Sequence, residues 1–124
     1  MGKMAEDRPR AVYLADVLKA LAHPERLRIV AVLCEGERNV IGLAGSLCLR
    51  QALVSQHLRI LRMSGLVASQ RRGGYAVYAL AQPRLRSLVE CLEGCHAVSP
   101  ENRTARKTAA AVRRAALQHR GGHR

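Results

Sequence analysis

Apolar residues recur at helical spacing through the first half of the chain. The spacing predicts four helices, over 10–22, 24–35, 40–47 and 51–64. His23-Pro24 separates the first two, and Pro24 suits the first turn of a helix because its missing N–H needs no partner there. Gly36 and Gly65 follow the second and fourth segments, where glycine commonly ends a helix.

Each of these helices has an apolar face that we expect to form the core. The expected inward residues are Val12, Leu14, Val17, Leu18 and Leu21, then Leu27, Val30, Leu33 and Cys34, then Ile41, Ala44 and Leu47, and finally Val54, Leu58 and Leu61. Phe and Trp are absent and aromatic residues make up only 2% of the chain, so the core is aliphatic, which favours packed helices.

After Gly65 the pattern changes to one typical of strands. The segments 66–70 and 75–80 flank Arg71-Arg72-Gly73-Gly74, whose glycines can adopt positive φ. This predicts a β-hairpin with arginines at its tip, in which Tyr75 and Tyr78 share one face as packing residues. A last helix is expected from 82 or 83 to 97.

The length of 124 residues allows one domain with terminal extensions. We expect a flexible N-terminus over 1–9, a folded domain over 10–97, and a basic tail over 98–124 that is helical, DNA-contacting or disordered. No apolar run reaches the roughly 18 residues that a bilayer crossing needs, and no signal core is visible, so we expect a soluble, cytoplasmic protein.

Positive charge dominates the chain. Lys and Arg number 21 against 9 Asp and Glu, a net charge of +12, and no acidic residue occurs between Glu37 and Glu90. Such a one-sided field favours nucleic acid as the partner, because each neutralised phosphate releases condensed counterions. An anionic membrane is disfavoured, since no basic amphipathic helix carries bulky aromatic anchors.

Four helices, a two-stranded wing and a further helix give the order of a mainly α, winged helix-turn-helix protein. Three segments resemble the ArsR/SmtB repressor family: 18–29 is similar to its opening motif, 54–62 with Gly65-Leu66-Val67 to its recognition helix, and 75–80 to its wing. The resemblance covers roughly residues 14–95. It implies a homodimeric bacterial repressor, with a dimer interface formed by the first and last helices, that an inducer releases from DNA.

The outward face of 51–64 is polar and basic, as a helix that reads the major groove requires. We expect DNA contacts from Gln51, Ala52, Ser55, Gln56, Arg59 and Arg62 on this helix and from Arg71 and Arg72 on the wing. The resemblance adds that Gln51, Ser55 and Gln56 match family positions that contact DNA. His57 is interpreted as a packing residue.

The four cysteines are candidates for sensing. The Cys-x-Cys that arsenic-type and cadmium-type members of the family carry on the third helix is absent, and only Cys95 among the positions of the zinc-type site on the last helix could bind metal. Cys91 and Cys95, four residues apart, share a helix face and could chelate a soft ion such as arsenite, antimonite, cadmium or lead. A trigonal ion needs a third thiolate, from the partner chain, Cys34 or Cys48.

Two alternatives to a metal site stay open. The segment 49–56 is similar to branches of the family that sense persulfides, which implies a bridge between Cys34 and Cys91 or Cys95. Cys34 and Cys48 are otherwise packing residues.

The sequence therefore predicts a DNA-binding repressor released by a thiophilic inducer, with a thiol-redox repressor and a constitutive basic DNA-binding protein as alternatives. An enzyme is disfavoured, because no nucleophile with an acid and a base, no phosphate-binding glycine loop and no HExxH motif occurs.

Overall fold

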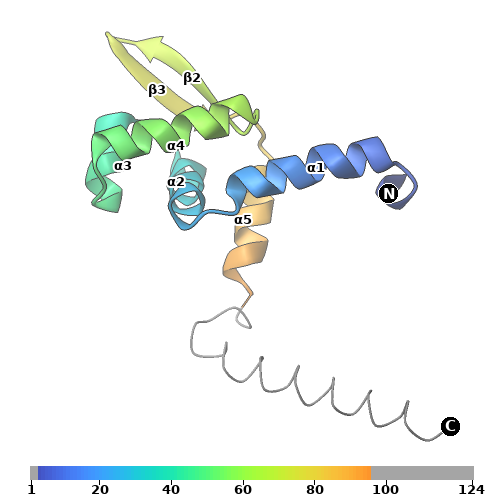
Figure 1. The fold of residues 1–124 in the computed structure, drawn as a ribbon. Coiled ribbons are helices and arrows are strands. Elements are labelled where there is room, and N and C mark those ends of the chain that lie inside the picture. The colour runs from blue at the N-terminus through green and yellow to red at the C-terminus, as the bar shows by residue number, and fades with distance from the viewer. Residues whose placement is uncertain (1–2, 96–124) are drawn as a thin grey trace, which may run out of the picture. The chain divides into compact units, whose positions relative to one another are not determined.

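The computed structural model describes residues 3–95 (Figure 1). In chain order the elements are a 3-10 turn η1 (Lys3–Ala5), α1 (Arg8–Leu21), α2 (Pro24–Glu35), β1 (Arg38–Asn39), α3 (Val40–Leu47), α4 (Gln51–Met63), β2 (Val67–Arg72), β3 (Tyr75–Leu80) and α5 (Leu85–Glu93). One compact unit ends at Glu90 and a second begins at Cys91. Within 3–95 no helix has the length and apolar character that a membrane crossing needs. The predicted basic tail, 98–124, lies outside the described residues.

Side-chain caps fix the starts of the first two helices. Asp7 accepts a hydrogen bond from the backbone N–H of Arg10 (3.0 Å), so α1 begins two residues before the predicted start. Together with η1, this extends helical structure into the segment 1–9. α2 begins at Pro24 as predicted, and the Nδ1 atom of His23 caps it by accepting from the N–H of Glu25 (3.1 Å).

The core is aliphatic, as predicted, and lies where α2, α3, α4 and the sheet meet. Its largest fully buried side chains are Ile29, Val30, Leu43, Val54, Leu58 and Leu61. The predicted inward face of α4 is confirmed in full. In the other helices the predicted inward faces were too wide: Val12, Leu18, Leu27 and Ile41 are exposed. The neighbouring elements cover a narrower part of each helix than its apolar residues span.

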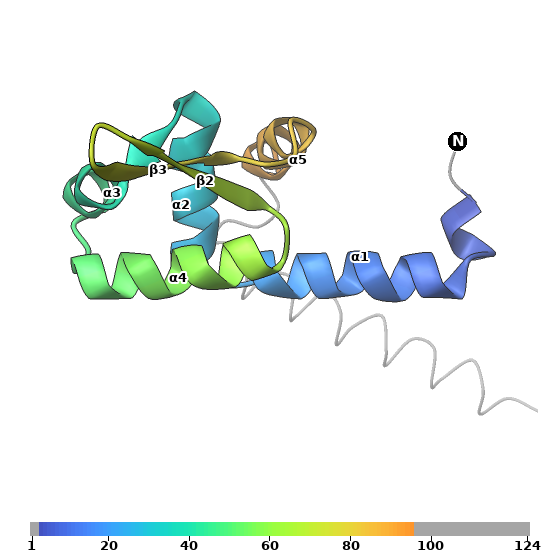
Figure 2. The same cartoon turned by 90° about the horizontal axis from the view of Figure 1, so that it is seen from above.

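The turn between α3 and α4 falls at 48–50, as predicted, and joins the two helices of the helix-turn-helix. Cys48 ends α3 in the left-handed conformation (φ 55°), and the N–H of Leu49 donates to the carbonyl of Ala44 (3.1 Å). The prediction that Cys48 is a packing residue is wrong, because the left-handed cap turns it out to solvent. In Figure 2, α3 lies beside the start of α4.

The wing is a three-stranded antiparallel sheet in the order β1-β3-β2. The hairpin is as predicted, with Val67 opposite Leu80 and Arg72 opposite Tyr75. Sequence analysis missed β1, because a strand of two residues is too short to show alternation. The arginines belong to β2 rather than to the tip, which consists of Gly73 and Gly74, both at positive φ (57° and 83°).

The last described helix, α5, is shorter than the predicted helix over 82 or 83 to 97. It buries Leu85 and Val89. Residues 96 and 97 lie outside the described part of the chain.

Candidate DNA-binding surface

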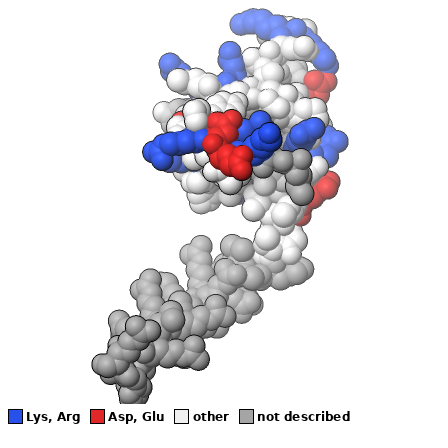
Figure 3. Space-filling model, turned by 90° about the vertical axis from the view of Figure 1, so that its right-hand side faces the viewer, with Lys and Arg blue, Asp and Glu red and all other residues white. Residues whose placement is uncertain are grey.

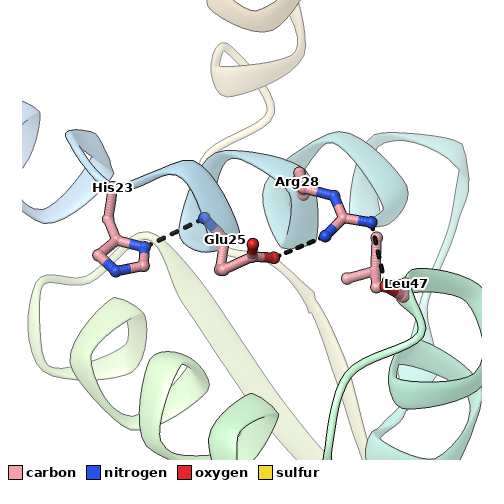
Figure 4. Close-up of polar contacts among 4 residues, drawn as sticks. All are labelled: His23, Glu25, Arg28 and Leu47. Atoms are coloured by element: carbon pink, nitrogen blue, oxygen red, sulfur yellow. Dashed lines mark hydrogen bonds and ion pairs between the residues drawn. The ribbon is translucent and has the colours of Figure 1, made fainter.

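Two arginines of α2 hold the ends of neighbouring helices. The Nε of Arg26 donates to the carbonyl of Ala20 near the end of α1 (2.5 Å). Arg28 donates to the carbonyl of Leu47, the last residue of α3 (3.0 Å), and to the carboxylate of Glu25 (2.7 Å), as Figure 4 shows. Carbonyls at a helix end have no partner within the helix, so these arginines satisfy them and fix α1 and α3 to α2.

The inner face of α4 carries one buried polar residue, His57. The residue is 6% exposed, and within residues 3–95 neither of its ring nitrogens has a hydrogen-bond partner. The ring centroid lies 4.5 Å from that of His23, at the junction of α1 and α2. Burial lowers the pKa of His57, and the positive charges of His23 and Arg26 lower it further against a smaller opposing effect of Glu25. His57 is a neutral packing residue, as the sequence indicates.

The outer face of α4 is open. All six side chains predicted to contact DNA from this helix are exposed: Gln51, Ala52, Ser55, Gln56, Arg59 and Arg62. Neither Arg59 nor Arg62 forms a hydrogen bond or ion pair within residues 3–95. Their guanidinium groups are therefore available to an external anion.

Two grooves border this face. The first, about 460 Å³, is lined by Ser55, Arg59, Arg62 and Met63 of α4 and by Tyr78 of β3. The second, about 440 Å³, lies at the start of α4 and is lined by Cys48, Leu49, Arg50, Ala52, Leu53 and Gln56. Arg50, the cap residue of α4, makes no side-chain hydrogen bond to the helix, which leaves its first N–H groups uncapped by a side chain. The outer face of α4 and both grooves are here called the α4 surface.

Tyr78 is a groove residue that sequence reasoning missed. Tyr75 and Tyr78 are three positions apart in β3, and side chains alternate along a strand, so the expectation that they share a face is wrong. Tyr75 is 58% exposed, whereas Tyr78 is partly buried against the core. The two-residue period of a strand was the signal in the sequence that could have placed Tyr75 and Tyr78 on opposite faces.

The wing carries the remaining predicted DNA contacts. Arg71 is exposed and makes no hydrogen bond or ion pair within 3–95, whereas Arg72 pairs with Glu37 and donates to Gln70 (3.3 Å). A band of Lys and Arg side chains lines the upper edge of Figure 3, at the height of the hairpin in Figure 1. The structure thus gathers six predicted side chains on α4 but gives the two wing arginines different surroundings.

The predicted sensing cysteines differ in exposure. Cys91 and Cys95 are exposed, and the Sγ of Cys95 donates to the carbonyl of Cys91 (3.3 Å). Cys34 is half-buried against the core. Residues 3–95 contain no group of three His, Cys, Asp or Glu side chains placed to hold a metal ion, so a third ligand for the Cys91 and Cys95 pair is not supplied by them.

Three exposed apolar residues remain on α1. Val12, Tyr13 and Leu18 are 49%, 60% and 54% exposed, although the sequence predicts an inward position for Val12 and Leu18. Because successive helix residues are about 100° apart, these three side chains point to different sides of α1, and each is available to a contact with another protein.

Comparison with known proteins places this arrangement among regulators of transcription. Residues 23–69 match the family described as bacterial regulatory protein, arsR family. A biofilm growth-associated repressor of Agrobacterium fabrum is 38% identical over 93 residues, 75% of this chain and 80% of that protein.

Solved structures show the same fold. Reduced HlyU from Vibrio cholerae aligns with a TM-score of 0.67 and 31% identity, over 73% of this chain and 96% of that one. The homodimeric winged helix-turn-helix DNA-binding domain of a possible ArsR-family regulator from Mycobacterium bovis aligns with a TM-score of 0.64 and 35% identity, over 73% of this chain and 88% of that one.

Proposed function

Since this chain belongs to the ArsR/SmtB family of bacterial transcriptional regulators, we propose that it is a repressor that binds duplex DNA as a homodimer through the α4 surface and the wing. The observation that carries the proposal is the exposed outer face of α4, whose Arg59 and Arg62 have no partner within residues 3–95. Gln51, Ser55 and Gln56 on the same face are suited to base edges, whereas the arginines are suited to phosphates.

The second part of the proposal is the dimer. Two copies related by a twofold axis would present their recognition helices to successive major grooves of a palindromic site. Exposed apolar residues of α1 are available for such a contact, and the similar domain from Mycobacterium bovis is described as homodimeric. Ala52 and the wing would then contact the backbone or the groove edge.

The third part is release by a thiol-seeking inducer. Exposed thiols at Cys91 and Cys95 are accessible to a soft ion such as arsenite, antimonite, cadmium or lead. A trigonal ion would take its third thiolate from the partner chain, since three ligands are not grouped within residues 3–95.

A thiol-redox repressor is the second candidate, in which reactive sulfur bridges Cys34 to Cys91 or Cys95. It is favoured by the similarity to HlyU, whose structure is described as that of the reduced protein. Both candidates use the same DNA-binding surface and differ in which thiols react and in what those thiols bind.

The test of DNA binding is a footprint of the full chain on genomic fragments from its own chromosome. The expected result is a protected palindrome, with affinity that falls steeply as salt rises. Protection without any palindrome would favour a constitutive basic DNA-binding protein instead.

The test of sensing is the intact mass of the protein and its DNA affinity after separate exposure to arsenite, antimonite, cadmium, lead and a persulfide donor. A bound ion adds its mass, a disulfide removes two hydrogens, and a sulfur bridge adds sulfur. Cys91→Ser/Cys95→Ser should abolish release, whereas Cys48→Ser, an exposed cysteine on the α4 surface, is the matched control. Full release of the double variant would contradict both candidates.

A further inference from the structure

The two wing arginines are neighbours in sequence but lie on opposite faces of the sheet. Arg71 and Arg72 are consecutive residues of β2, and consecutive side chains of a strand point to opposite faces. The strand therefore directs the two side chains to opposite faces, but an arginine side chain is long and flexible, so its guanidinium stays on its own face only where a partner holds it there.

Cross-strand pairing identifies the face that α4 borders. Ser69 pairs with Tyr78, so both side chains lie on one face, and Tyr78 lines the groove formed with α4. Arg71 is two residues from Ser69 and lies on that same face. Arg72 lies on the other face, with Gln70 and with its cross-strand partner Tyr75.

On this second face Arg72 is already engaged. Its guanidinium pairs with the carboxylate of Glu37 and donates to the Oε1 of Gln70 (3.3 Å). Glu37 directly precedes β1, the strand that pairs with the far side of β3, and it is the last acidic residue before Glu90. A carboxylate at the border of an acid-free stretch thus pairs with one wing arginine and leaves the other without a partner within 3–95.

We propose that Glu37 is a positioning residue of the wing, which holds Arg72 on the face turned away from α4, so that Arg71 alone of the two reaches the DNA phosphates. The inference rests on the proposed function, because it concerns how the wing meets duplex DNA. Glu37 thereby sets the number of wing cations that bind phosphate.

The salt dependence of DNA binding tests this directly. For a duplex of mixed sequence, each phosphate that a protein cation neutralises adds about 0.9 to the steepness of log K against log salt. Per protomer, Arg71→Gln should reduce the steepness by about 0.9, and Arg72→Gln should leave it unchanged. Glu37→Gln should increase the steepness by about 0.9, because Arg72 then becomes available to phosphate.

The double variant Glu37→Gln/Arg72→Gln separates positioning from a general structural effect. It should return the steepness to that of the unchanged protein, which a loss of wing structure would not do. An equal loss for Arg71→Gln and Arg72→Gln, or an unchanged steepness for Glu37→Gln, would overturn the inference while leaving the proposed function intact. An unchanged protein that fails to bind duplex DNA at low salt would overturn the proposed function itself.

Discussion

Helices α2 and α4 both carry arginines, but the fold uses them in different ways. In α2, Arg26 and Arg28 donate to carbonyls near the ends of α1 and α3. In α4, Arg59 and Arg62 have no partner within residues 3–95. The same side chain therefore completes the scaffold in one helix and remains available to a ligand in the other, and the difference is visible only in what each guanidinium contacts.

The starts of the two helices differ in the same sense. His23 caps α2 by accepting from the N–H of Glu25 (3.1 Å), whereas Arg50 begins α4 without any side-chain cap. Uncapped N–H groups at a helix start favour an anion nearby. The arginine contacts and the helix caps thus agree that α2 supports the fold internally and that α4 is suited to bind an external polyanion.

Removing the α4 arginines should have the largest effect on function. We expect Arg59→Ala/Arg62→Ala to weaken duplex binding on the order of 100-fold, because two charge-assisted contacts to phosphate are lost. The unfolding free energy should stay within about 0.5 kcal/mol, since both side chains are exposed and make no hydrogen bond or ion pair within residues 3–95. Fluorescence anisotropy with a labelled duplex and urea unfolding measure the two quantities.

Arg71→Ala/Arg72→Ala in the wing is a useful comparison for that result, because it removes the same number of charges from the other predicted contact region. If only Arg71 reaches phosphate, its effect on the salt dependence should be about half that of the α4 pair. A double α4 variant that binds as tightly as the unchanged protein would contradict the role assigned to α4.

The α2 arginines should show the opposite pattern. Arg28→Ala removes a hydrogen bond to the end of α3 and a partly exposed ion pair with Glu25, so we expect a loss of about 1 kcal/mol of unfolding free energy. The salt dependence of DNA binding should not change, because Arg28 contacts protein rather than phosphate. A shallower salt dependence with unchanged stability would place Arg28 with the DNA-binding residues instead.

The sequence was sufficient for the elements that depend on local signals. Pro24, Gly36 and Gly65 mark helix boundaries by backbone chemistry, and the inward face of α4 follows from the helical period, so these predictions are confirmed. Exposure of Val12, Leu18 and Ile41 could not be predicted in the same way, because it depends on which side of a helix its neighbours cover.

Which arginines already have a partner within the fold was harder to predict than which arginines are exposed. Arg71 and Arg72 look equivalent in the sequence, and only the strand register shows that they lie on opposite faces. The pairing of Arg72 with Glu37 spans 35 positions, so no local pattern indicates it. The sequence could thus predict which residues belong to the candidate site. It could not predict which of their side chains are already paired within the protein.

The smallest expected effect concerns His57, the packing residue between α4 and α2. Its pKa is lowered from 6.5 by burial and by the charges of His23 and Arg26, so the folded state binds this proton less readily than the unfolded chain. Stability from the neutral ring is therefore complete above about pH 6.5 and is lost as the pH falls from there through the lower pKa of the folded state. Urea unfolding at a series of pH values should show this loss, and His57→Leu should diminish it.

His23→Asn is the matched variant, because Asn can still cap α2 while the neighbouring ring and its charge are removed. In this variant we expect the pKa of His57 to be higher than in the unchanged protein, because the charge of His23 is gone. It should still lie below the ordinary value, since burial and Arg26 still act on the ring. Titration of the His57 ring protons by NMR measures that pKa directly. A His57 that titrates at or above its ordinary value would show that α4 does not rest on a buried neutral ring, and the contrast between a closed inner face and an open outer face of this helix would fail.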